Sequence, residues 1–291
     1  MRVALHGKGI SDEKCDIVRE ILKELSVEGF QLSLSESFKK ELISNQIEVG
    51  EYETYSKERS DRFADFIISI GGDGTLLETV THIGKKEIPI LGINIGRLGF
   101  LATTTRDQIS EISKSLKKRE YTIDSRTLIS LECDECLFGT NNFALNEFAI
   151  LKKDSSSMIV VHAYLDGDYL NSYWADGLIV ATPTGSTGYS LSCGGPVVLP
   201  QSHNFVITPV SPHNLSTRPL VVPDSSVISF EIEGRGENFL ASLDSRSVTV
   251  TADYKLTVRK EEFEAKLIRI DEFTFVDTLR NKLSWGLDVR N

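Results

Sequence analysis

Residues 66–77 read Phe66-Ile67-Ile68-Ser69-Ile70-Gly71-Gly72-Asp73-Gly74-Thr75-Leu76-Leu77, and they carry the clearest indication of the fold class in the sequence. Its first five residues form a nearly continuous apolar run, which is typical of a central strand in a parallel sheet. Three glycines and one aspartate follow at once, and a helix is predicted from Thr75. Because open α/β sheets bind ligands at the carboxyl ends of their strands, this turn is a candidate ligand site.

The glycine turn has a composition that suits a phosphate group. Glycine lets the backbone approach a ligand closely, and the N–H groups of the turn and of the helix N-terminus can point at one anion. A phosphate repels the carboxylate of Asp73 unless that carboxylate binds a metal or takes a proton. Asp73 could therefore deprotonate a hydroxyl that attacks phosphorus. The alternative is a Gly-Asp-Gly tight turn without any chemistry.

The sequence on both sides of this turn alternates strand patterns with helical patterns as far as residue 119. The expected strands are 2–6, 30–34, 66–70 and 88–93. The expected helices are 11–28, 36–49, one that begins at 75, and 110–119. Strands that alternate with helices predict an α/β domain with a parallel sheet.

The pattern changes near residue 120, because long helical periods give way to short β-rich runs up to residue 270. Turn signals such as Asp166-Gly167-Asp168 separate these runs, which predicts an antiparallel, sandwich-like or barrel-like second domain. The predicted domains are 1–122 (α/β), 123–270 (β-rich) and 271–291, a C-terminal segment expected to pack back on the first domain.

The composition excludes several classes of protein. The chain has 291 residues, and 32 basic against 42 acidic side chains give a net charge of −10. A chain this acidic is a poor general binder of nucleic acid or of an anionic membrane. No apolar window approaches the length of a membrane-spanning helix. Four cysteines in 291 residues do not make a disulfide framework, so a cytoplasmic location is expected.

Two further segments carry polar groups that a sandwich does not need in order to fold. The stretch 176–192 runs from a strand into a dense series of hydroxyls and glycines, and Tyr189 offers an aromatic face for stacking. A nucleotide could use all of these groups, although an ordinary turn region rich in small residues is the alternative. Asn146 and Glu147 interrupt the apolar run of a strand expected over 143–151, where unpaired polar groups are costly to bury.

Together these segments resemble the ATP-dependent NAD kinase family. The resemblance rests on Gly71–Thr75, Asn94–Leu101, Asn146-Glu147, and Asp176–Ser192 with Gly194-Gly195-Pro196. It implies transfer of the γ-phosphoryl group of ATP to the 2′-hydroxyl of the adenosine ribose of NAD. It also implies a two-domain fold with the active site in the crevice between the domains, and a homotetramer or homodimer.

The same resemblance implies roles for individual residues. Asp73 is the expected general base, and a divalent cation, most simply Mg²⁺, screens the triphosphate without a metal-binding side chain of the protein. The implied NAD-binding residues are Asp73, Gly74, Phe100, Asn146, Glu147, Asp176, Thr184, Thr187, Gly188, Tyr189, Ser190, Leu191, Ser192 and Arg246. The implied phosphate and ATP contacts are Gly71, Gly72, Gly74 and Thr75.

The chain departs from the family pattern at three positions. Relatives often have alanine at the position of Gly188, arginine at that of Trp174, and Asp-Gly-Gln where this chain has Asp244-Ser245-Arg246. Arg246 is therefore a candidate to replace the missing cation near the dinucleotide. Two rival functions remain open from the residues: a diacylglycerol-type or sphingoid-type lipid kinase, and a sensor that binds NAD or NADP without turnover.

Two sets of residues receive no functional assignment from the sequence. Cys133 and Cys136 have the spacing of a metal-binding pair, but Cys15 and Cys193 offer no second pair, so two thiols at a hairpin edge are expected. None of the five histidines lies in a recognisable hydrolase context. Each is expected at the surface or partly buried.

Overall fold

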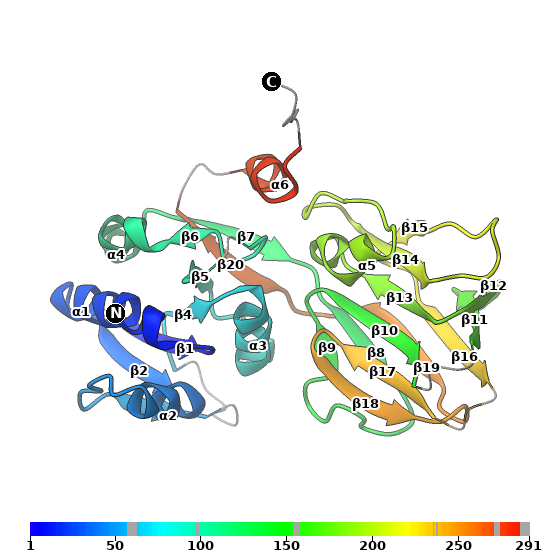
Figure 1. The fold of residues 1–291 in the computed structure, drawn as a ribbon, viewed down its shortest axis with the longest axis horizontal. Coiled ribbons are helices and arrows are strands. Elements are labelled where there is room, and N and C mark those ends of the chain that lie inside the picture. The colour runs from blue at the N-terminus through cyan, green and yellow to red at the C-terminus, as the bar shows by residue number, and fades with distance from the viewer. Residues whose placement is uncertain are drawn as a thin grey trace. The chain divides into compact units, whose positions relative to one another are not determined.

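The computed structural model describes residues 1–56, 63–96, 99–153, 158–234, 236, 238–270 and 274–285. The chain divides into two compact units, drawn in Figure 1. Unit 1 consists of Met1–Ser125 and Ala265–Asn291, and unit 2 is Arg126–Glu264. By this division residues 265–270 belong to unit 1, whereas the boundaries drawn from the sequence, 122/123 and 270/271, stay predictions. No described helix is long and apolar enough to cross a membrane.

Unit 1 is built around one sheet with the strand order β3-β2-β1-β4-β5-β20-β7, and β6 pairs with β5. Its strands are β1 (Arg2–Gly7), β2 (Gln31–Ser35), β3 (Glu53–Tyr55), β4 (Phe66–Gly71), β5 (Ile90–Asn94), β6 (Thr104–Thr105), β7 (Thr122–Arg126) and β20 (Ala265–Arg269). Its helices are α1 (Cys15–Val27), α2 (Glu36–Ser44), α3 (Asp73–Ile83), α4 (Ile109–Lys118) and α6 (Phe275–Leu283). The strands from β3 to β5 pair in parallel.

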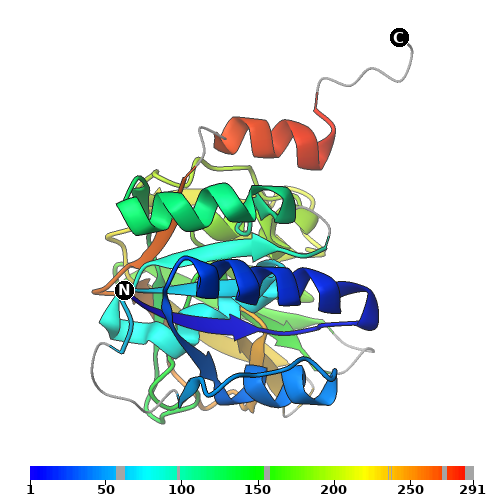
Figure 2. The same ribbon diagram turned by 90° about the vertical axis from the view of Figure 1, so that its left-hand side faces the viewer.

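Helices cover both faces of this sheet. On one face α1 and α4 lie side by side (Figures 1 and 2), and their apolar residues pack with Val3, Leu5, Ile68 and Ile70 in a buried cluster. The alternate residues of β4 point to the other face, where the hydroxyl of Thr79 on α3 donates to Ser69 Oγ at 2.9 Å. A strand covered on both faces is expected to be mostly apolar, which explains the nearly continuous apolar run 66–70, and Thr79 satisfies the one polar side chain in it.

Unit 2 is an antiparallel sandwich of two sheets with the strand orders β15-β14-β13-β10-β17-β18 and β12-β11-β16-β19-β8-β9. The first sheet contains β10 (Glu147–Lys152), β13 (Gly177–Ala181), β14 (Asn204–Val210), β15 (Leu220–Pro223), β17 (Phe239–Leu243) and β18 (Arg246–Val250). The second contains β8 (Ile129–Glu132), β9 (Phe143–Ala144), β11 (Ile159–Leu165), β12 (Asp168–Ala175), β16 (Ile228–Gly234) and β19 (Leu256–Lys260). Phe148 of the first sheet stacks on Phe230 of the second, with ring centroids 5.7 Å apart, within the buried core.

The predicted fold class, an α/β first unit and a β-sandwich second unit, is confirmed. Two local predictions are wrong. The helix expected over 36–49 ends at Ser44, and the strand expected over 143–151 is split, because the chain leaves one sheet after Ala144 and enters the other at Glu147. This switch places Leu145 and Asn146 in the link between the two sheets, which is why polar groups interrupt an apolar run there.

Candidate active site

In unit 1 the glycine turn joins β4 to α3, and its glycines serve two purposes. A side chain at Gly71 would place its Cβ 2.2 Å from Thr75 Oγ1, so only glycine fits beneath the first turn of the helix. Gly72 and Gly74 are exposed, and a Cβ added at either would meet no atom of the described residues within 4 Å. The outer side of the turn is therefore open, and a ligand can reach the N-terminus of α3 there.

The Asp73 carboxylate is held by three backbone N–H groups from one loop. Phe100 N–H donates to Oδ2 at 2.8 Å, while Leu101 and Ala102 N–H donate to Oδ1 at 3.0 and 3.1 Å. At Gly99 an added Cβ would lie 1.9 Å from Oδ1, so this loop packs directly on the carboxylate. Arg97 and Leu98, which precede the loop in the family motif, lie outside the described residues.

These hydrogen bonds hold the carboxylate in place, but they do not occupy every position at which it can accept a hydrogen bond. A carboxylate oxygen accepts two hydrogen bonds, and Oδ2 accepts one from the described part of the chain. Asp73 is half-buried, so solvent or a ligand can reach it. Oδ2 can therefore accept a proton from a hydroxyl group placed beside the turn.

In unit 2 a second carboxylate, that of Asp244, holds the link that contains Asn146. Leu145 N–H donates to Oδ2 at 3.0 Å, and Asn146 and Glu147 N–H donate to Oδ1 at 2.8 and 3.2 Å. Asp244 lies in the turn between β17 and β18 with a φ of 52°, in the left-handed region. The sequence did not single out Asp244 for this role, because its three donors lie about a hundred residues away along the chain.

Asn146 of this link and the adjacent Glu147 each have a buried side-chain oxygen that can still accept a hydrogen bond. Asn146 Oδ1 and Glu147 Oε2 have no hydrogen-bond partner among the described residues. Burial, with the charge of Asp244 as a second cause, raises the pKa of Glu147 to about 8, against the opposing effect of the Tyr189 N–H. At neutral pH the carboxyl group is therefore mostly protonated, so it can donate one hydrogen bond and accept others.

The hydroxyl-rich segment packs directly on this pair. An added Cβ at Gly185 would lie 2.0 Å from Asn146 O, and one at Gly188 would lie 2.9 Å from Glu147 Oε2. Thr184 Oγ1 accepts a hydrogen bond from Arg126 Nη1 at 3.2 Å. The predicted residues 184–188 and 146–147 are thus brought together, and the close packing explains the glycines between them.

Other predicted binding residues serve internal contacts in this structure. The buried hydroxyl of Ser190 pairs with Thr208 Oγ1 at 2.8 Å, and Asp176 pairs with Lys152 Nζ at 2.6 Å. Tyr189 and Ser192 are exposed, and Leu191 and Thr187 are half-buried, with Thr187 Oγ1 donating to Thr184 O at 3.1 Å. Contact of each of these residues with NAD stays a prediction.

Arg246 is engaged with the backbone of its own unit. Its guanidinium donates to the carbonyl groups of Asn141 and Phe143, and it lies 5.9 Å from the ring centroids of Phe138 and Phe143. Burial lowers the pKa of Arg246, and the charge of Asp244 opposes this shift. In this structure Arg246 therefore holds the backbone of its own unit next to Asp244. Its interaction with a dinucleotide stays a hypothesis.

The structure thus contains a parallel α/β unit with a carboxylate held at a glycine turn, and a sandwich with buried acceptors beside a hydroxyl-rich turn. These are the features from which a nucleotide-dependent phosphotransferase is expected. Comparison with known proteins identifies the family within this class. The family model of the ATP-NAD kinase N-terminal domain matches residues 3–121, and that of the C-terminal domain matches residues 145–270.

Curated relatives match along the whole chain. An NAD kinase of Cytophaga hutchinsonii is 53% identical over 292 residues, and one of Flavobacterium psychrophilum is 45% identical over 294, each with 100% coverage of both chains. An NAD kinase from Archaeoglobus fulgidus, solved in complex with ATP, is 29% identical with a TM-score of 0.72 and 98% coverage of both chains. Yeast NADH kinase, solved with NADH, is 22% identical with a TM-score of 0.89, and it covers 100% of this chain and 89% of its own, which supports the fold alone.

The chain belongs to the NAD kinase family. This confirms the resemblance that the sequence motifs indicated. Relatives of the family are ATP-dependent phosphotransferases, and neither the lipid kinase nor the sensor finds support in these similarities.

Proposed function

We propose that this protein transfers the γ-phosphoryl group of ATP to the 2′-hydroxyl of the adenosine ribose of NAD, with Asp73 as general base. The observation that carries the proposal is the Asp73 carboxylate, held by three N–H groups at the open end of β4 with acceptor capacity left on Oδ2. The ribose oxygen forms a bond to phosphorus, the bond between the γ-phosphorus and the bridging oxygen breaks, and ADP leaves. Asp73 takes the hydroxyl proton and passes it to solvent.

The buried pair in unit 2 suits a ribose. Asn146 Oδ1 can accept a hydrogen bond from a sugar hydroxyl, and the protonated Glu147 can donate to one hydroxyl and accept from another. Buried polar atoms without protein partners favour a ligand that supplies those partners. The exposed ring of Tyr189, 38% accessible, offers a face on which a base can stack.

The glycine turn suits the phosphate groups of ATP. Gly72 and Gly74 are exposed and leave room for a close approach to the start of α3, whereas Gly71 is buried and Thr75 N–H donates to Gly72 O at 3.1 Å. Contact of Gly71 and Thr75 with a phosphate stays a prediction. Mg²⁺ keeps several waters and binds readily to substrate phosphates, so the cation can arrive with ATP without a metal-binding side chain of the protein. When bound, Mg²⁺ neutralises charge on the phosphates, while the chain aligns the groups.

A coupled assay tests the proposal. Purified protein is mixed with MgATP and NAD, and product is detected with a dehydrogenase that accepts NADP but not NAD. NADP formation that depends on both substrates supports the proposal. NAD binding without NADP formation would favour the sensor, and phosphorylation of a diacylglycerol in place of NAD would favour the lipid kinase.

Two broader predictions accompany this function. The resemblance favours a homotetramer or homodimer, which light scattering of the purified protein measures directly. Cysteine content and charge favour the cytoplasm, which cell fractionation tests.

A further inference from the structure

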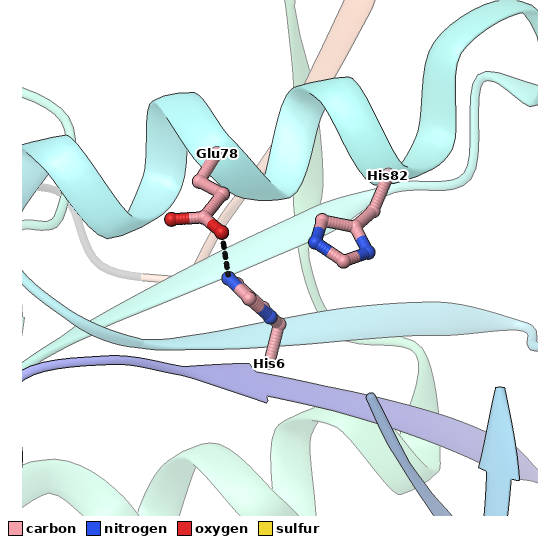
Figure 3. A group of neighbouring side chains, drawn as sticks. All are labelled: His6, Glu78 and His82. Carbon is pink, nitrogen blue, oxygen red and sulfur yellow. Dashed lines mark ion pairs between the residues drawn. The ribbon is translucent and has the colours of Figure 1, made fainter. Parts of the chain in front are cut away.

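Three potential metal ligands converge in unit 1, away from the glycine turn. His6 comes from β1, and Glu78 and His82 come from α3, where a spacing of four residues places both on one face of the helix. One ligand atom from each lies within 4.8 Å of the other two. Figure 3 shows the Glu78 carboxylate pointing at the His6 ring, with the His82 ring beside it.

Both imidazoles are buried, contrary to the prediction that all histidines lie at the surface or are partly buried. His6 is 0% exposed and His82 is 7% exposed, and their ring centroids are 4.4 Å apart. The side chain of Glu78 is 27% exposed, so the cluster has one side open to solvent.

The ligand atoms are oriented by outer partners. His6 Nδ1 pairs with Ser35 Oγ at 2.9 Å, and the same oxygen accepts a hydrogen bond from Phe38 N–H at 3.2 Å. If Nδ1 carries the proton, Nε2 presents its lone pair towards Glu78. Lys8 Nζ holds Glu78 Oε2 at 2.8 Å, which turns Oε1 towards His6. Metal-binding histidines typically have such a partner on the second ring nitrogen.

The geometry points to a binding site for a divalent transition-metal ion of the Zn²⁺ type, formed by His6 Nε2, Glu78 Oε1 and one nitrogen of His82. The Nε2–Oε1 distance of 3.9 Å is too long for a hydrogen bond. Ligands that are each about 2.1 Å from a tetrahedral ion lie about 3.4 Å apart, so small side-chain shifts close the site. Two imidazoles and one carboxylate favour Zn²⁺ or its neighbours over Mg²⁺ and Ca²⁺, which prefer oxygen ligands.

The ion would act as a brace rather than as a reactant. Glu78 and His82 lie in the second and third turns of α3, and Asp73 is the first residue of the same helix. A metal that joins these turns to β1 therefore fixes the helix that carries the proposed base. Because the ion binds the folded state, it also raises the stability of unit 1 in proportion to the logarithm of its concentration.

Zinc titration of the full chain tests this site. All proteins carry Cys136→Ser, so that the Cys133 and Cys136 thiolates do not bind Zn²⁺ as a pair. Affinity is measured by competition with a chromophoric zinc chelator, thermal unfolding is recorded with and without Zn²⁺, and Co²⁺ is used as a spectroscopic probe. We expect one Zn²⁺ per chain, a rise in the unfolding temperature, visible Co²⁺ absorption, and no displacement by excess Mg²⁺.

Two ligand variants and one matched control separate this site from adventitious binding. Glu78→Gln and His82→Gln are each expected to weaken Zn²⁺ binding at least about 100-fold, and Glu78, being partly exposed, is the safer change for folding. His162 is the control, because it pairs with Ser172 Oγ at 2.6 Å and lies 3.4 Å from Glu233 Oε1, a pair of partners like that of His6. His162→Gln should leave Zn²⁺ affinity unchanged.

Three results would overturn the proposed metal site. A parent protein that binds no Zn²⁺ or Co²⁺ overturns the proposal. So does binding that survives both ligand variants, and so does displacement by Mg²⁺ at concentrations comparable to those of Zn²⁺.

Discussion

Units 1 and 2 use the same hydrogen-bonding device, a carboxylate that accepts three backbone N–H groups, for opposite purposes. In unit 1 the carboxylate of Asp73 is half-buried, and the loop 99–102 supports it. In unit 2 burial raises the pKa of Asp244 despite its N–H donors and Arg246, and the link 145–147 is what the carboxylate supports.

Access from solvent decides whether the carboxylate or its backbone partner takes part in function. Where the carboxylate can be reached from outside, the backbone is the scaffold and the side chain is the reactive group. Where the carboxylate is buried, it is the scaffold, and the link presents the unpaired atoms of Asn146 and Glu147. Substitutions in the two devices should therefore affect different quantities, turnover in unit 1 and NAD binding in unit 2.

The largest effect is expected from Asp73→Asn. The amide cannot take a proton at neutral pH, so turnover should fall by about 10²–10⁴-fold. Affinity for NAD, measured by isothermal titration, should survive. Equal losses of binding and turnover would show that Asp73 is structural, and the comparison between the two devices would then fail.

A smaller loss is expected from Gly99→Ala. The new Cβ would lie 1.9 Å from Asp73 Oδ1, so the carboxylate or the loop has to move, and a shift of this size can lower kcat up to about 100-fold. Gly96→Ala is the matched control, because its Cβ would meet no atom of the described part of the chain closer than 3.9 Å. Steady-state kinetics should show a change in kcat for Gly99→Ala and almost none for Gly96→Ala.

In unit 2 we expect Asp244→Ala to act on binding and stability. Three N–H groups lose their acceptor, which costs about 1–3 kcal/mol for a buried donor left unsatisfied. The KM for NAD should rise more than kcat falls, and urea unfolding should register the loss of stability. Asp253→Ala, at an exposed position, is the control. A variant that loses kcat with an unchanged KM would contradict the supporting role of Asp244.

The smallest effect is expected from Glu147→Gln, on the pH dependence of stability. The pKa of Glu147 is about 8 in the folded chain, against an ordinary value of 4.5, so the folded protein holds the extra proton between these values. The extra proton on Glu147 stabilises the folded protein fully below about pH 4.5. This contribution to the free energy of unfolding is lost as the pH rises through 8, by on the order of 1 kcal/mol per pH unit. Glu147→Gln should therefore flatten the pH dependence of urea unfolding. An unchanged slope would mean that Glu147 is ionised in the fold.

The central strand, the glycine turn and the alternation of strands and helices in unit 1 could be predicted from the sequence, because each depends on residues that are neighbours along the chain. The sequence identified 146–147 and 184–188 as unusual for the same reason. It could not reveal the acceptor role of Asp244, the contact of Gly99 with Asp73, or the meeting of His6 with α3, because each depends on residues far apart in the chain. Strand β12 was missed because its exposed and half-buried residues give no alternating signal, and β14 was missed because Pro209 interrupts its run, although six of its seven residues are buried.

The position of β20 affects the order in which the protein can fold as it is made. Unit 2 is contiguous, so a ribosome has delivered all of it by residue 264. The sheet of unit 1 still lacks β20 at that moment, although this strand pairs with β5 beside the strand that leads to Asp73. Domains tend to fold as units during synthesis. The earlier half of the chain therefore has to wait for the later half to emerge before its central sheet is complete.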